Sequence, residues 1–178
     1  MSAACIESQS VKTTEMGGPE RGDDGGKKIK GRKRHLLVDT LEVLLAVLIP
    51  SAGREDGAAA SILLGLVPSQ AFPRLVTILA DQQYHNQALD TWMAEHRAGW
   101  RIEGQIRPTG VQGFTPLAKR WVMERTNAWH GRFRRNSKDY ERSVESSTAM
   151  IQISNIQRML NRLFPCDRPA FHYRKDAA

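Results

Sequence analysis

Apolar and β-branched residues gather in short runs along the first part of the chain, and these runs predict strands. A weak alternation predicts a short strand over residues 5–12. The runs at 35–38 and 43–49 are bounded by polar residues and favour a hairpin of two buried strands. A compact apolar run predicts a strand over 75–80, and the alternation over 100–106 is typical of an edge strand.

Helices are predicted where apolar residues recur three and four positions apart, over 56–66, 86–96 and 119–132. The glycine-rich, charged stretch over 17–33 predicts a mobile loop. A last, long helix is expected over 146–163. Its large apolar side chains form a stripe that we expect to be buried: Ile151, Ile153, Ile156, Met159, Leu160 and Leu163.

Strands in a meander, followed by strands that alternate with helices, predict an α/β fold: a mixed sheet with helices on both faces. The chain has 178 residues, enough for one sizeable core but too few for two ordinary domains. We therefore expect one domain over residues 1–165. The remaining residues, 166–178, are expected to form a disordered tail.

The chain is basic, with a net charge of +7. This charge favours nucleic acid or an anionic membrane surface as a partner, although a basic protein without such a partner fits the composition too. Cys5 and Cys166 form no zinc or disulfide pattern. The most apolar stretch, 41–50, is far shorter than the roughly 20 residues of a membrane helix. With no secretory signal apparent, the expected location is the cytoplasm.

Three carboxylates fall at informative places among these elements. Glu7 lies in the first predicted strand, Asp81 directly follows the strand at 75–80, and Glu124 lies in the helix at 119–132. We expect those two strands to be neighbours, which brings the first two acids together, and we expect a helix packed on that edge to supply the third. Carboxylate oxygens suit Mg²⁺, and a pair of such ions catalyses phosphoryl transfer. The chain contains 19 acidic residues, so spacing alone leaves the reading of solvated surface carboxylates open.

The sequence around these acids is more specific. The strings SQSVK, GKKIKGRKRHLLVDT, LADQQY and KRWVMERTNAWHGRFRRNSKDYE resemble, in this order, the DDE insertion-sequence transposases of bacteria, and the resemblance runs from about residue 6 to residue 163. It implies a ribonuclease H-like fold and metal-dependent DNA cleavage and strand transfer in transposition, with two Mg²⁺ (or Mn²⁺) ions. It also implies double-stranded DNA of transposon ends and target as the partner, a possible homo-oligomer, and a bacterial, nucleoid-associated location without a membrane.

The resemblance assigns roles residue by residue. It implies that Glu7, Asp81 and Glu124 are the three metal-binding, catalytic acids, and that Arg120, one helical turn before Glu124, matches the family's arginine. Glu7 stands where the family has aspartate, which moves the carboxylate outward by about 1–1.5 Å. Glutamines 82 and 83 replace the usual glycines. The family's amino-terminal region, which helps to bind the transposon ends, is expected to be missing here, so a degenerate remnant fits as well.

Basic residues gather in two segments, one between Glu7 and Asp81 in sequence and one around and after Glu124. They would contact DNA phosphates, or they would form solvated or salt-bridged surfaces. The candidate DNA-binding residues are Lys27, Lys28, Lys30, Arg32, Lys33, Arg34, Arg132, Arg134 and Arg135. The alternative function is therefore a catalytically inactive, basic DNA-binding protein, and metal-dependent nicking of DNA separates it from a transposase.

Overall fold

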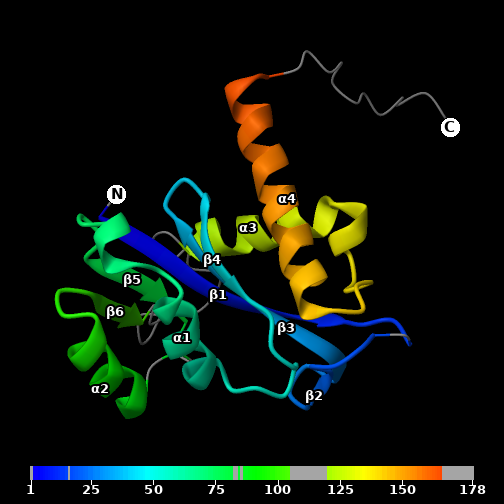
Figure 1. The fold of residues 1–178 in the computed structure, drawn as a ribbon, viewed down its shortest axis with the longest axis horizontal. Helices are drawn as coiled ribbons and strands as arrows, with labels where there is room; N and C mark the ends of the chain where they lie inside the picture. Colours follow the sequence, from blue (N-terminus) through cyan, green and yellow to red (C-terminus); the bar gives the residue numbers. More distant parts are fainter. Residues whose placement is uncertain (1, 16, 82–83, 85, 105–119, 166–178) are drawn as a thin grey trace, which may run out of the picture.

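The computed structural model describes residues 2–15, 17–81, 84, 86–104 and 120–165. Within these residues six strands form one sheet, in the order β2-β3-β1-β5-β6 with β4 also paired to β3 (Figure 1). The strands are β1 (Ala3–Lys12), β2 (Gly22–Asp24), β3 (Ile29–Asp39), β4 (Leu44–Leu48), β5 (Thr77–Ala80) and β6 (Arg101–Gly104). The α-helices are α1 (Asp56–Gly65), α2 (Gln87–His96), α3 (Arg120–Arg132) and α4 (Val144–Leu163).

The sheet is mixed, as the order of elements predicted. β3 pairs antiparallel with β1, β2 and β4, whereas β1, β5 and β6 run parallel to one another. The expected hairpin is β3–β4, and the expected strands at 5–12, 75–80 and 100–106 are β1, β5 and β6. The prediction of a loop over 17–33 is wrong in part, because β2 and the first residues of β3 form a second hairpin there.

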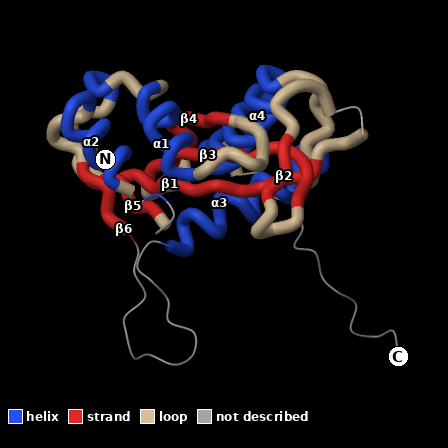
Figure 2. The backbone as a smooth tube through the Cα atoms, turned by 90° about the horizontal axis from the view of Figure 1, so that it is seen from below, coloured by secondary structure: helices blue, strands red, loops and turns tan. Residues whose placement is uncertain are grey.

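Helices cover both faces of the sheet, and alternation along β1 decides which side chain meets which layer. Ala4 and Ile6 of β1 pack with Leu63 of α1 and Leu89 of α2. Cys5, between them, points to the other face, where α3 and α4 contribute Val122, Met123 and Ile151. Figure 2 shows α1 and α3 on opposite sides of β1. The sheet therefore separates two apolar layers. Alternate side chains of β1 point into alternate layers.

The last helix packs differently from its predicted orientation. Ile151 is buried, but Ile153, Ile156, Leu160 and Leu163 are exposed. The α4 residues that are buried against the rest of the protein lie on a different face of the helix: Ser147, Ile151, Ser154, Asn155 and Arg158. Their polar groups find partners, since Ser147 bonds Asp139, Ser154 bonds His130 and Asn155 bonds the backbone of Leu44. Polar contacts thus set the rotation of α4, and the apolar stripe points outward.

None of the described helices combines the length and the apolar character that crossing a bilayer requires.

Candidate active site

The pairing of β1 with β5 brings the first two predicted acids together. The last registered pair on these parallel strands is Cys5 with Leu79, and Glu7 and Asp81 each follow two residues later. Neighbouring strands are about 4.8 Å apart, so the two positions lie side by side at the carboxyl end of β5. The Glu7 side chain is half-buried and that of Asp81 is exposed. The sequence prediction that these strands are neighbours is confirmed.

A buried tyrosine, Tyr84, lies close enough to Glu7 and Asp81 for their negative charges to act on its hydroxyl. The hydroxyl of Tyr84 shares a 3.0 Å hydrogen bond with Nδ1 of His35, and the ring is 1% exposed. Burial, and then the negative charges of Asp56, Glu7 and Asp81, raise the pKa of Tyr84. The tyrosine is therefore a neutral phenol at any physiological pH.

The groups beneath Tyr84 form a closed polar network. The carboxylate of Asp56, at the start of α1, accepts hydrogen bonds from Oγ of Ser8 and from Nζ of Lys33, each of 3.0 Å. Burial lowers the pKa of His35 to about 4 although the charge of Asp56 opposes this shift. His35 is thus neutral at pH 7, and the network holds β1, β3 and α1 together behind the acids.

Helix α3 lies on the face of the sheet to which Glu7 points. Glu7 has the same parity on β1 as Cys5, and it pairs across the ladder with Leu36, which belongs to the same apolar layer. Val122 and Met123 of α3 are buried in this layer. Glu124 directly follows Met123 and is exposed. The third acid is thus on a helix packed against the Glu7 face. Arg120 begins α3, but its side chain lies outside the described part.

Comparison with known proteins decides the family. Residues 1–156 match the family model of the transposase DDE domain. The chain belongs to the DDE transposase family. The match covers most of the transposase chain, and it confirms the resemblance inferred from the strings around the acids. No curated protein sequence matches the chain.

The fold of the transposase is shared with solved structures. The catalytic core domain of BIV integrase is similar, with a TM-score of 0.51 and 11% sequence identity, over 85% of this chain and 81% of that chain. This likeness confirms the expected ribonuclease H-like α/β fold. Family and fold together assign the protein to DNA transposition, and members of the family act on DNA.

The side chains at this site can be compared with the ligands that a divalent metal ion requires. Transposases of this family generally use divalent metal ions. Glu7 and Asp81 offer carboxylate oxygens on adjacent strands, which are the donors that hard cations take. Their charges also act together on Tyr84. In the described part of the chain, no three His, Cys, Asp or Glu side chains come close enough to form a metal site. Glu7 and Asp81 thus have the donor chemistry that a divalent cation takes, but the described residues form no compact three-residue group of such donors.

The basic residues of the transposase divide into two classes. Lys27, Lys28 and Lys30 are exposed in and beside the turn between β2 and β3, and Arg132, Arg134 and Arg135 are exposed at the end of α3 and beyond. In contrast, Arg32, Lys33 and Arg34 are 0, 8 and 2% exposed. The expectation that these last three contact DNA is wrong in this fold, because each cation is turned into the protein.

The buried arginines tie the carboxyl-terminal segment to β3. Arg32 lies 3.2 Å from the carboxylate of Asp139 and also donates to the carbonyls of Pro19, Glu141 and Arg142. Arg34 donates to the carbonyls of residues 136 and 138, and burial lowers its pKa. The sequence contained one signal of this role. The basic residues that end at Arg34 are followed, after His35, by the apolar residues of β3, with no turn residue between them, which indicates that both belong to one strand.

Sequence reasoning also missed a buried ion cluster at the β3–β4 turn. Glu42 is 2% exposed and has a positive φ of 65°, a conformation that favours glycine. Its carboxylate pairs with Arg125 of α3 at 3.1 Å, with Arg162 of α4 at 3.0 Å, and with Arg158. Burial and Arg162 lower the pKa of Arg158 to about 10, so it remains charged at pH 7. This cluster locks α3, the helix of Glu124, to the sheet and to α4.

Proposed function

We propose that this domain catalyses metal-dependent cleavage and strand transfer of DNA, with Glu7, Asp81 and Glu124 as the metal-binding acids. The observation that carries the proposal is the register of β1 and β5, which sets Glu7 beside Asp81. The packing of α3 on the Glu7 face supports the third assignment. Two Mg²⁺ or Mn²⁺ ions would activate the attacking water or 3′-hydroxyl and stabilise the leaving oxygen.

The protein's own groups have separate tasks in this proposal. Glu7 and Asp81 would supply the negative charge that retains cations, and Glu124 would supply the third carboxylate from α3. The neutral pair of Tyr84 and His35 adds no positive charge that would compete with the metal ions. Arg120, one helical turn before Glu124, orients Glu124 or a DNA phosphate.

Exposed lysines extend the proposed DNA path beyond the acids. Lys30 precedes Leu36, the partner of Glu7, on β3, and the intervening residues span roughly 20 Å. A duplex rises ~3.4 Å per base pair, so this distance corresponds to about six base pairs. Lys27, Lys28 and Lys30 would contact phosphates at one end of this path. The exposed Arg132, Arg134 and Arg135 would contact DNA beyond α3.

Nicking of supercoiled plasmid tests the proposal. We expect nicking with Mg²⁺ or Mn²⁺, none with a chelator, and a fall to background in Asp81→Asn and in Glu124→Gln. Glu95→Gln is the matched control, because Glu95 is an exposed acid on α2. Nicking that persists in both acid variants would remove these residues from the site. Salt-sensitive DNA binding without any metal-dependent nicking would support the catalytically inactive binding protein instead.

A further inference from the structure

Helix α3 carries tryptophan and arginine side chains along the face that points away from the sheet. Trp121 is 52% exposed, and Arg125, one helical turn later, is exposed too. Ala128, Trp129 and Arg132 continue this face at spacings of three and four residues. Of these, Ala128 and Arg132 are exposed and Trp129 is half-buried. These five residues form a surface, the Trp–Arg face, that contains no acidic side chain.

Each arginine of the Trp–Arg face lies over the ring of a tryptophan. Cζ of Arg125 is 5.5 Å from the ring centroid of Trp121, and Cζ of Arg132 is 4.8 Å from that of Trp129. A cavity of about 230 Å³ is lined by Arg125, Ala128, Trp129 and Arg132. Roughly 150 Å³ is enough to hold one six-membered ring. The face therefore has room for a planar ring beside Trp129, with a cation on either side.

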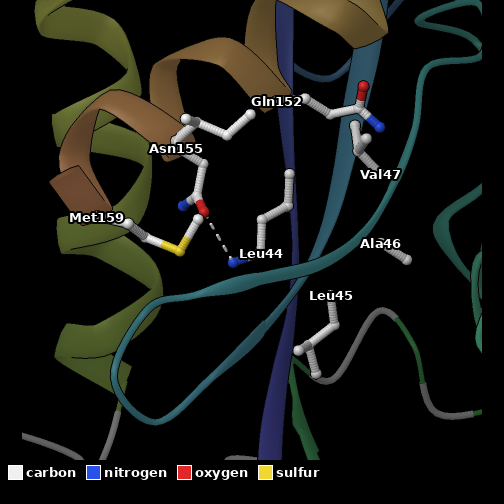
Figure 3. Close-up of a pocket in the computed structure, with 8 residues that line it drawn as sticks. Leu44, Leu45, Ala46, Val47, Gln152, Asn155 and Met159 are labelled. Atoms are coloured by element: carbon white, nitrogen blue, oxygen red, sulfur yellow. Dashed lines mark hydrogen bonds between the residues drawn. The ribbon is translucent and has the colours of Figure 1, made fainter. Parts of the chain in front are cut away.

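The Trp–Arg face is anchored on its inner side. The carboxylate of Glu42 pairs with Arg125 and also with two arginines of α4. Helix α4 is fixed to β4 in turn, because the Leu44 amide donates a hydrogen bond to the side chain of Asn155 (Figure 3). One buried carboxylate is thus shared among three guanidinium groups, which leaves an excess of positive charge next to the exposed rings.

The chemistry of this face favours single-stranded DNA as its occupant. Exposed aromatic rings stack on nucleotide bases, and the cations beside them attract phosphates. In a duplex the flat faces of the bases are covered by neighbouring base pairs, so a tryptophan reaches them only where the strand is unpaired. The net charge of +7 also favours a polyanion.

We propose that the Trp–Arg face binds unpaired nucleotides of a DNA strand, whose bases stack on Trp121 and Trp129. Eight residues of helix separate the two tryptophans, a rise of about 12 Å, which corresponds to about three or four stacked nucleotides at ~3.4 Å each. Glu124 is exposed and directly precedes Arg125. A strand bound here would pass beside Glu124, and only this last point rests on the proposed function.

Fluorescence anisotropy with two labelled single strands tests the proposal. One is an oligothymidylate of ~12 nucleotides, and the other is a fully abasic strand of the same length, which keeps the phosphates but has no bases. Both are measured with the full chain at one salt concentration and with a chelator, so that no cleavage occurs. Because stacking contributes roughly 5- to 150-fold per base, we expect oligothymidylate to bind about tenfold more tightly or better.

Substitutions locate the stacking surface. Trp121→Ala should reduce the preference for oligothymidylate at least fivefold, whereas Trp121→Phe should retain most of it, because phenylalanine also stacks. Phe164→Ala removes a 73% exposed aromatic ring after α4 and is the matched control, with an unchanged preference. Arg132→Gln should weaken the binding of both strands to the same extent, because both carry phosphates.

Three results would overturn the proposal. Equal affinity of the unaltered chain for the two strands would do so without any substitution. A preference for bases that persists in Trp121→Ala would place the stacking surface elsewhere. An equal loss of affinity for both strands in Trp121→Ala would make Trp121 a structural residue only. Plasmid nicking takes no part in these measurements, so a failure here leaves the three acids untouched, and absent nicking leaves this proposal untouched.

Discussion

The Nε atom of Arg125 lies 3.1 Å from Oε1 of Glu42. This ion pair links the helix that carries Glu124 to the turn between β3 and β4. Arg158 and Arg162 bind the same carboxylate from α4, so one side chain joins three elements. Because Glu124 immediately precedes Arg125, the orientation of the third predicted acid depends on a residue distant in sequence.

Removing the Glu42 carboxylate should destabilise the fold strongly. Glu42→Gln leaves buried guanidinium charge uncompensated, and we expect a loss of about 3–5 kcal/mol in the free energy of unfolding, measured by urea denaturation. Glu103→Gln breaks an exposed pair with Arg101 and should change that free energy by less than ~1 kcal/mol. An effect of Glu42→Gln as small as that of the control would contradict the role of this cluster.

The buried Arg32 should behave as a structural residue rather than a DNA contact. Arg32→Met leaves the carboxylate of Asp139 buried and unpaired, and we expect a loss of about 3–5 kcal/mol in unfolding free energy. Lys30→Met, two residues earlier on the same strand but exposed, should leave stability nearly unchanged. Equal stability of the two variants would show that Arg32 is not held as described.

DNA affinity should depend on salt through the exposed lysines. Replacing Lys27, Lys28 and Lys30 together by glutamine should lower the slope of log affinity against log salt by about 2–3, because up to three phosphate contacts are lost. Fluorescence anisotropy with a duplex of arbitrary sequence measures this slope. Replacement of Arg74 and Arg101, exposed cations away from these segments, is the control and should leave the slope unchanged. A slope unaffected by the triple substitution would remove these lysines from the interface.

Two buried histidines should make the fold sensitive to acid. Burial lowers the pKa of both His35 and His130 to about 4, below the unfolded value of ~6.5. Between these values the unfolded chain binds more protons than the native one, so stability falls as pH decreases from about 6.5 toward 4. Each histidine should contribute on the order of 2–3 kcal/mol to this fall.

Urea denaturation at several values between pH 5 and 7 measures the effect before most carboxylates titrate. His130→Gln should flatten the profile, whereas His96→Gln, at an exposed position, should not. A profile that stays equally steep in His130→Gln would show that His130 is not kept neutral by its surroundings.

Shortening Glu7 should raise catalysis if it is a metal ligand. Glu7→Asp returns the carboxylate to the length found in the family, and a displacement of ~1 Å at a reacting centre costs up to 10²-fold. We therefore expect metal-dependent plasmid nicking to rise by roughly 10–10²-fold, with Mn²⁺ showing the gain first. Vigorous nicking by the unaltered chain that persists in Glu7→Gln would exclude Glu7 from the site.

Much of the fold was readable from local patterns. Alternation along residues 5–12 and the apolar runs of the hairpin identified the central strands, because a strand with one or two buried faces records its burial in its own sequence. The family strings identified Glu7, Asp81 and Glu124 as the acids to examine. We expected β1 and β5 to be neighbours because a shared site for Glu7 and Asp81 requires it, and the register confirmed this placement.

The sequence by itself thus determined the elements, the family and the residues that carry charge. The tertiary structure decided which of these groups meet partners. Arg32 and Lys30 belong to one basic run, yet only Arg32 points to a layer where Asp139 and several carbonyls neutralise it. In α4, Ile156 fits a buried stripe by its spacing, but the polar partners of Ser154 and Arg158 rotate the helix and leave Ile156 exposed. Periodicity shows that a helix has an apolar face, whereas the free energy of satisfying buried polar groups decides which face turns inward.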